Sequence, residues 1–294
     1  MAAPAIDRRK GLSIALLGGL AISLDIPMVR LSEGDMWSVQ FLRSVNVVIV
    51  TLAVWLAARL FFNKRIELVP GRFGLPVIAL YGVSTLLFFY AVYGTTTANL
   101  VFILAFNPMF SALFGWLILK EKPLPPTFLA MAVMTIGVFI IVQEGLAGGH
   151  FLGDMSALMA AVTIALAITL SRASGRDMGF AALISAVVPA IVAGLLVVSQ
   201  GGLNMAAPGW TMLNGLILVP TAFYCLALAP VFISGPTVGM FYLLETILAP
   251  TWIWMIFKEA PSPQTLIGGG ILLAALAAHS LWELSEERRA RAPG

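Results

Sequence analysis

Long apolar stretches, separated by short connections rich in glycine, proline and polar residues, dominate the chain. Each stretch runs for about 17 to 25 residues, the length that a helix needs to cross the roughly 30 Å hydrocarbon core of a bilayer. The pattern therefore predicts an all-α integral membrane protein with ten transmembrane helices. They lie at approximately residues 11–30, 37–61, 71–93, 96–119, 124–143, 154–173, 178–199, 211–232, 236–257 and 264–283.

The composition supports this prediction and excludes several classes of protein. Hydrophobic residues make up 60% of the 294 residues, charged residues make up 11%, and the mean hydropathy is +0.98. A water-soluble protein of this size has too little interior to hide so much apolar surface, so a soluble enzyme and a nucleic-acid-binding protein are excluded. With one cysteine, Cys225, and no Cys/His cluster at metal-ligand spacing, neither a disulfide nor a metal or other cofactor is expected.

The basic residues predict the orientation of the ten spans. If the N-terminus lies inside, fourteen of the 17 Lys and Arg residues fall on the inner side, and only Arg30, Arg43 and Lys258 fall in the outer half. Cytoplasmic loops carry such an excess of basic residues, so both termini are expected in the cytoplasm. The N-terminal segment 1–10 and the basic tail 284–294 then need no partner beyond lipid headgroups. Although the first span follows basic residues as in a secretory signal, nine further spans argue against its cleavage.

The chain also contains an internal repeat. A shared pattern, K-E-x-P-x-P-x-T, occurs at 120–127 and again at 258–265, an offset of 138 residues. Upstream, several identities keep an offset of 142 residues: Gly11 with Gly153, Arg30 with Arg172, and Asp35-Met36 with Asp177-Met178.

Two repeats are therefore expected, at residues 11–145 and 151–283. Each copy holds five spans, an odd number, so the second copy must cross the membrane in the opposite sense to the first. Such an inverted-topology repeat is typical of alternating-access carriers, in which two halves of similar energy expose a central site first to one side and then to the other.

Two stretches of the sequence resemble a known family. They run from Phe89-Tyr90 through Asn107-Pro108 to Lys120-Glu121, and from Ala227 through Leu244-Glu245 to Lys258-Glu259. Both are similar to the paired EamA domains of the drug/metabolite transporter (DMT) superfamily, and the sequence as a whole is most similar to the bacterial YddG-type amino acid exporters. The resemblance implies a ten-helix carrier of small metabolites in the bacterial inner membrane, with a central cavity between the repeats.

The second copy departs from the family pattern at one point. It has Glu245-Thr246 where EamA domains often have Glu-Pro, and the proline lies at Pro250 instead. A helix break near Glu245 is therefore expected to be moved or softened.

Glu245 is the most informative polar residue. It lies nine residues after Pro236, about 13 Å along a helix and thus near the middle of the bilayer. A carboxylate at that depth is expected to face the bundle interior or a watery cavity. The repeat offset of 138 gives Asn107, so an amide and a carboxylate should face each other across the axis. Two interpretations stay open: a structural tie between helices, or a site for substrate and, at Glu245, for a proton.

A polar stripe on the second span adds to the candidate site. Gln40, Arg43 and Asn46 recur at three-residue spacing and so share a helix face, and Arg43 lies at a depth similar to that of Asp25 on the first span. Either Asp25 and Arg43 form an ion pair that neutralises both charges, or Arg43 attracts a substrate carboxylate. Both possibilities are kept.

Aromatic side chains complete the candidate cavity. Tyr242 falls on the face of the ninth span that carries Glu245, and Tyr81 lies on the third span. Such residues either pack between helices or contact a substrate. The candidate substrate-binding residues are thus Glu245, Asn107, Tyr242, Asn46, Tyr81 and Arg43.

The sequence as a whole predicts an alternating-access carrier that exports small metabolites, with amino acids, aromatic or otherwise neutral, as the favoured class. A zwitterion would place its ammonium near Glu245 and its side chain among the aromatic residues. An intramembrane enzyme is the less favoured alternative, because the chain has no paired catalytic carboxylates, H-E-x-x-H or G-x-S-x-G. A channel-like pore is also less favoured, since no filter-like loop or charged ring is evident. Proton coupling and the oligomeric state stay open.

Overall fold

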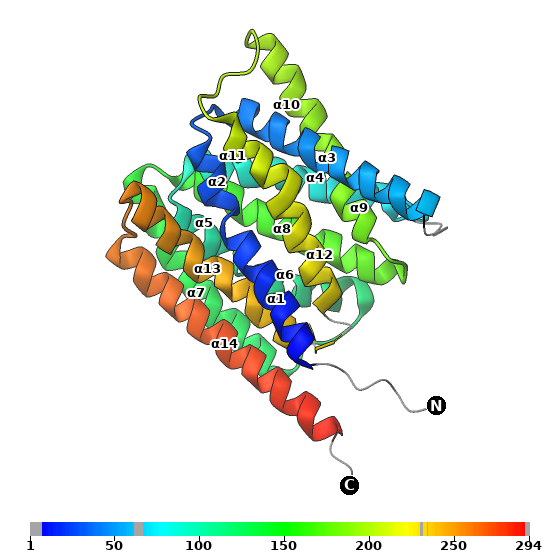
Figure 1. Ribbon diagram of the computed structural model, residues 1–294. Helices are drawn as coiled ribbons and strands as arrows, with labels where there is room; N and C mark the ends of the chain where they lie inside the picture. The colour runs from blue at the N-terminus through cyan, green and yellow to red at the C-terminus, as the bar shows by residue number, and fades with distance from the viewer. Residues whose placement is uncertain (1–7, 62–66, 230–231, 234, 292–294) are drawn as a thin grey trace.

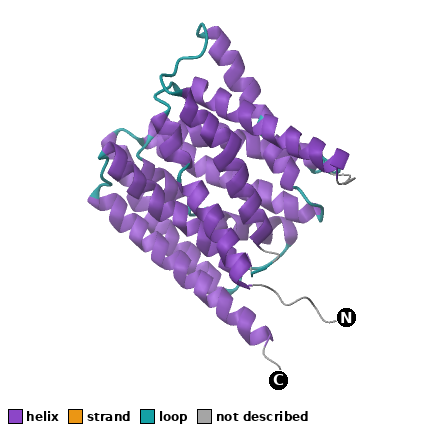
Figure 2. Ribbon diagram, viewed as in Figure 1, coloured by secondary structure: helices purple, strands orange, loops and turns teal. Residues whose placement is uncertain are grey.

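The computed structural model describes residues 8–61, 67–229, 232–233 and 235–291. This part of the chain is almost entirely helical and contains no strand (Figure 2). The helices are α1 (Arg8–Ser23), α2 (Asp25–Leu31), α3 (Met36–Phe61), α4 (Gly74–Gly94), α5 (Thr97–Leu104), α6 (Asn107–Leu119), α7 (Pro125–Gly148), α8 (Phe151–Ser174), α9 (Gly179–Ile184), α10 (Val187–Ser199), α11 (Pro208–Leu213), the π-helical η1 (Asn214–Leu218), α12 (Val219–Leu228), α13 (Gly235–Phe257) and α14 (Pro263–Arg291).

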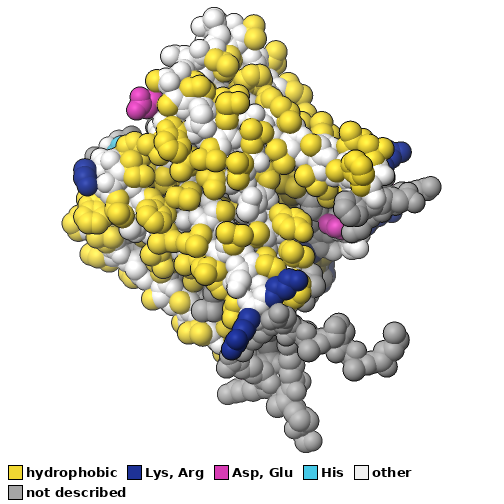
Figure 3. Space-filling view, viewed as in Figure 1, with side chains coloured by type: hydrophobic (Ala, Val, Ile, Leu, Met, Phe, Trp, Pro, Cys, Tyr) yellow, Lys and Arg dark blue, Asp and Glu magenta, His cyan; other side chains and the backbone are white. Residues whose placement is uncertain are grey.

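The helices follow the ten predicted apolar stretches. Nine helical segments of the described chain are long and apolar enough to cross a membrane, and α13, a helix of 23 residues, lies where the ninth span was predicted. The outer surface is apolar too: Leu129 and Leu195 are 68% and 69% exposed. Hydrophobic side chains cover most of the face in Figure 3, with the charged ones toward its margins. The prediction of a multi-pass α-helical membrane protein is confirmed.

Helix packing follows the inverted repeat. The second and fifth spans contact their own counterparts, because α3 packs on α10 and α7 packs on α14. The contact of α4 with α8 is matched by that of α12 with α1, and the contact of α6 with α8 by that of α13 with α1. A two-fold operation that exchanges the halves maps the first two contacts onto themselves and exchanges the members of the other two pairs, as a pseudo-two-fold axis requires. The start of α1 and the end of α14 lie at the same end of the bundle (Figure 1).

The repeated motif also repeats in backbone conformation. Lys120 and Lys258, which are equivalent in the two copies, adopt left-handed backbone conformations with φ of 63° and 59°. Residues other than glycine rarely do so. Each lysine follows the last residue of its helix, α6 or α13, and is followed in turn by a glutamate. The sequence repeat is therefore a structural repeat.

Glycines allow the tightest helix contacts. A Cβ atom at Gly153 on α8 would lie 2.3 Å from the carbonyl carbon and oxygen of Gly94 at the end of α4. Between α7 and α14, a Cβ on Gly137 or on Gly268 would lie 2.7 Å from the carbonyl oxygen of the other. Only a residue without a side chain permits such close backbone approach.

Four of the spans are interrupted part-way along. The first changes from α1 to α2 at Leu24, the fourth from α5 to α6 at Ala105-Phe106, and the seventh from α9 to α10 at Ser185-Ala186. The eighth contains the π-helical turn η1. The ninth, α13, instead continues as one helix through Pro250, so the expected softening near Glu245 leaves no break in the helix. Irregular backbone at membrane depth is tolerated where it is buried in protein or lines a cavity.

Candidate functional site

A large cavity lies where the helices are interrupted. Its volume is about 1160 Å³, and its lining includes Asp25 at the start of α2, Asn107 at the start of α6 and Ser185 between α9 and α10. The cavity extends from these residues to one end of the bundle. There its lining includes Gly115, Glu121, Lys122, Arg172, His279 and Glu283. Small-molecule sites typically occupy about 300 to 1,000 Å³, so the cavity has room for a small metabolite.

Arg43 is held in a buried polar cluster beside the cavity. Its Nη2 donates to Asp25 Oδ2 at 2.8 Å, and its Nε donates to Asn214 Oδ1 at 2.8 Å. Asn214 Nδ2 donates in turn to Asp25 Oδ1 at 2.7 Å, which closes the cluster. The guanidinium also lies over the ring of Phe89, 5.2 Å from its centroid. The structure thus contains the predicted Asp25–Arg43 ion pair, and a substrate carboxylate would have to compete with Asp25 for Arg43.

Glu245 lies on α13 and lines the same cavity. Its side chain is half-buried, and none of the described residues forms a hydrogen bond or ion pair with its carboxylate. Its charged neighbours are Asp25 and Arg43. Because these two neutralise each other, an ionised Glu245 leaves one uncompensated negative charge in this part of the cavity.

The other predicted site residues do not all line the cavity. Asn107 lines the cavity, with its Oδ1 accepting a hydrogen bond from Ser111 Oγ at 3.2 Å, and Tyr81 lines it as well. Asn46 does not line it; this residue is 5% exposed and packs against Gly215 of η1. The side chain of Tyr242 lies outside the described residues. The structure therefore brings Glu245, Asn107, Tyr81 and Arg43 together around one cavity.

Asn214 and Ser44 are two polar residues of this region that sequence patterns did not predict. Asn214 is fully buried and ties Arg43 to Asp25, and its only sequence signal is that it is a lone amide within an apolar stretch. Ser44 follows Arg43, lines the cavity and is 1% exposed, and its Oγ has no hydrogen-bond partner among the described residues. An unpartnered buried hydroxyl of this kind is uncommon in proteins.

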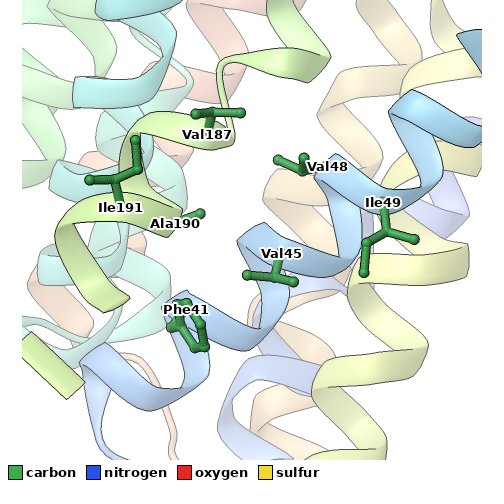
Figure 4. A pocket seen from close by; sticks show the side chains of 7 residues that line it. All are labelled: Phe41, Val45, Val48, Ile49, Val187, Ala190 and Ile191. Atoms are coloured by element: carbon green, nitrogen blue, oxygen red, sulfur yellow. The ribbon is translucent and has the colours of Figure 1, made fainter. Parts of the chain in front are cut away.

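A second hollow, of about 330 Å³, is an apolar groove between α3 and α10 (Figure 4). Its lining consists of Phe41, Val45, Val48, Ile49, Val187, Ala190 and Ile191. No polar side chain is present to orient a polar solute, and Ile191 is 58% exposed on the lipid-facing surface. In addition, no group of three or more His, Cys, Asp or Glu residues within the described ranges could hold a metal ion. The cavity around Glu245 is therefore the candidate site.

Inverted repeats around a central cavity are a common architecture of membrane transporters. Residues 9–143, just under half of the chain, match the EamA-like transporter family. An EamA-like transporter domain is thus detected over the first predicted repeat, and it implies a transporter and not an enzyme.

Solved structures support the fold. Seventeen chains are similar, and one crystal structure has a TM-score of 0.62 at 16% sequence identity, covering 97% of this chain and 100% of its own. At that identity the likeness bears on the fold alone. No curated protein gives a significant match to the sequence.

Proposed function

We propose that this protein is an alternating-access carrier that exports small amines with an apolar portion, with neutral and aromatic amino acids as the favoured substrates. It acts in the bacterial inner membrane with both termini in the cytoplasm. The observation that carries the proposal is the Glu245 carboxylate, which lines the cavity between the repeats without a hydrogen-bond partner among the described residues.

The charge around Glu245 supports a cationic group on the substrate. Asp25 and Arg43 already pair with each other at 2.8 Å, so the surplus charge in this region belongs to Glu245. A substrate ammonium or a proton would neutralise that charge, and a buried carboxylate in a membrane requires such compensation. An amino acid carries the ammonium itself.

The remaining lining supports the apolar portion of the substrate. Tyr81, Phe88 and Phe223 contribute aromatic surface from α4 and α12, and Leu104 and Leu243 contribute aliphatic surface. Asn107 provides an amide that can bind a substrate carboxylate without displacing Asp25 from Arg43. The pose of the amino acid therefore differs from one in which Arg43 binds the carboxylate directly.

The test is transport by the purified protein in proteoliposomes. A panel of radiolabelled amino acids should enter with saturable rates, exchange against unlabelled substrate inside, and emerge chemically unchanged. Repeating the assay with and without an imposed pH gradient separates proton-coupled from facilitated transport. Recovery of a chemically altered solute would support an intramembrane enzyme, and flux without saturation or exchange would support a pore. Absence of any amino acid flux in a protein that exchanges another class of amine would overturn the substrate assignment.

A further inference from the structure

Two ion pairs between the repeats are related by the internal symmetry. Arg30 and Arg172 are equivalent at an offset of 142 residues, and Glu121 and Glu259 are equivalent at an offset of 138. Arg30 pairs with Glu259, and Arg172 pairs with Glu121, so each pair joins one repeat to the other. An operation that exchanges the repeats therefore exchanges the two pairs, which places them at opposite ends of the bundle.

The same backbone feature presents both glutamates. Glu121 follows the left-handed Lys120 at the end of α6, and Glu259 follows the left-handed Lys258 at the end of α13. These helices belong to the fourth and ninth spans, which also carry Asn107 and Glu245. The two spans thus connect the candidate site to an arginine–glutamate pair at each end.

The two pairs differ in how enclosed they are. The side chains of Arg30 and Glu259 are 24% and 30% exposed, whereas those of Arg172 and Glu121 are 52% and 54% exposed. Arg30 Nη2 also lies 3.4 Å from the carbonyl oxygens of Val92 and Thr95. The Glu259 carboxylate accepts a further hydrogen bond from the Thr97 amide at 3.3 Å. The Arg30 pair is therefore part of a closed polar network.

A buried polar layer extends behind the Arg30 pair. Thr95 Oγ1 donates to Asp154 Oδ1 at 2.6 Å, and Asn99 Nδ2 donates to the same oxygen at 3.3 Å. Thr265 Oγ1 donates to Asn99 Oδ1 at 2.6 Å. These bonds tie α5, α8 and α14 together at this end. The cavity lining contains Glu121 and Arg172 but neither Arg30 nor Glu259, so the cavity reaches the Arg172 end and is sealed from the Arg30 end.

We propose that the two symmetry-related pairs, Arg30–Glu259 and Arg172–Glu121, are the alternating gates of the carrier. In the conformation described here the Arg30 gate is closed and the cavity is open toward the Arg172 end. The Arg172–Glu121 pair is intact at that open end but more exposed, so in the opposite conformation the Arg30 pair becomes the exposed one and the Arg172 pair the enclosed one. Because the same chemistry closes both ends, the two conformations can be close in energy, as a carrier that alternates between them requires. This inference rests on the proposed transport function, but its test does not need the substrate.

The test measures access to the cavity from each end. Ala105 lines the cavity at the break between α5 and α6, so Ala105→Cys is introduced in a Cys225→Ser background. A membrane-impermeant maleimide is then applied to intact cells and to inverted vesicles, which expose opposite faces. With the Arg30 gate closed, labelling should be faster from the face that bears Arg172.

Opening the gate should reverse this preference. Arg30→Gln should raise labelling from the Arg30 face by about fivefold or more, a typical conformational coupling, and lower it from the Arg172 face. The exchanged pair Arg30→Glu with Glu259→Arg should restore much of the original preference. Arg172→Gln should leave labelling from the Arg30 face slow. Arg176→Gln is the matched control, since the Arg176–Glu67 pair is 56% and 63% exposed and has no counterpart in the repeat.

Unchanged access in Arg30→Gln, with the cysteine still reactive in detergent and thermal stability retained, would overturn the gate assignment. The assignment also fails if the exchanged pair behaves no better than the single variant. Because labelling requires no amino acid, a protein that transports amino acids but fails this test loses only the gates. A protein that passes it but transports no amino acid keeps the gates and loses the substrate assignment.

Discussion

Replacing Arg43 by methionine tests the buried polar cluster most directly. The substitution keeps an apolar chain of moderate length but removes the ion pair to Asp25 and the hydrogen bond to Asn214, both 2.8 Å long. Hydrogen bonds within a membrane contribute about 0.6 kcal/mol on average and up to about 1.7 kcal/mol, so the two contacts together account for roughly 1 to 3 kcal/mol. The Asp25 charge is then left buried, and stranding one partner of a buried pair costs about 3 to 5 kcal/mol. We expect a loss of about 3 kcal/mol, where these ranges meet.

The assay is thermal unfolding of the purified protein in detergent. In chains of about 150 to 250 residues, 1 kcal/mol shifts Tm by about 2 to 4 °C, so Arg43→Met should lower Tm by roughly 6 to 12 °C. Adding Asp25→Asn removes the stranded charge and keeps a group that can bond to Asn214, so the double variant should recover more than half of the loss. Arg176→Met is the control: its pair with Glu67 is exposed, and a loss below about 1 kcal/mol is expected.

Two outcomes would contradict this account of the cluster. If Arg43→Met unfolds within about 2 °C of the parent protein, the cluster contributes little to stability, and Arg43 is free to bind substrate. If the double variant is less stable than Arg43→Met, the stranded charge on Asp25 is not the source of the loss.

Three further predictions concern the site, the packing and the orientation. Glu245→Gln should lower the initial flux per folded protein severely. The Tm should change by less than about 4 °C, because the described residues give the carboxylate no hydrogen bond that the amide could lose. Near-normal flux would remove Glu245 from the mechanism. Gly153→Ala should destabilise the protein by about 1 to 3 kcal/mol in the same unfolding assay, because the new Cβ would overlap the Gly94 carbonyl at 2.3 Å. Gly209→Ala is the control and should be tolerated, because no atom lies within 4 Å of a Cβ built there. A C-terminal fusion to a reporter that works only in the cytoplasm should be active. Activity of a C-terminal fusion to a reporter that works only in the periplasm would reverse the proposed orientation.

The sequence predicts the spans well because the signal for a membrane helix is strong and local. About twenty apolar residues can satisfy their backbone hydrogen bonds in lipid only as a helix. Counting along those helices predicts equivalent depths for Glu245 and Asn107, and both residues line one cavity. The Asp25–Arg43 pair is predicted for the same reason: two unpaired charges at a similar depth in lipid would be costly.

Residue spacing alone does not predict which residues of the second span line the cavity. Successive residues of an α-helix are rotated by about 100°, so a step of three residues falls about 60° short of a full turn. From Arg43 the stripe therefore drifts off the cavity: Ser44 and Val47 line it, whereas Asn46 packs against Gly215. Gln40 is likewise directed elsewhere, donating to the Thr85 carbonyl at 3.3 Å. Three polar residues at i, i+3 and i+6 share a face only approximately.

Asn214 shows a different reason for incomplete prediction. Its partners, Asp25 and Arg43, precede it by 189 and 171 residues, and no periodicity within one span reports a contact between spans that distant. The helix geometry is also unusual at this point, because Asn214 begins the π-helical turn η1. Such turns occur often at functional sites, but local propensity does not reveal them.

The internal symmetry is preserved at the proposed gates, of which a carrier needs two, and is lost around the proposed substrate site, of which it needs one. A gate is needed at each end of the path, and the residues assigned to the gates are preserved between the repeats: arginine at Arg30 and Arg172, and glutamate at Glu121 and Glu259. In the proposed gating mechanism, their different exposure reflects one conformation and not a difference in chemistry. Selection for two similar end states would keep both copies.

A substrate, by contrast, needs only one set of contacts, and the symmetry is broken where those contacts are proposed. The equivalent positions read Asp25 against Ala167, Arg43 against Ser185, and Asn107 against Glu245. An amino acid is itself unsymmetrical, with an ammonium at one side and a carboxylate at the other. A two-fold symmetric site would offer the same group to both, which suits only one of them. A carboxylate from the second repeat and an amide from the first, both lining the one cavity, avoid that conflict. The loss of symmetry around the cavity is therefore a reason, independent of burial or depth, to place the substrate between Asn107 and Glu245.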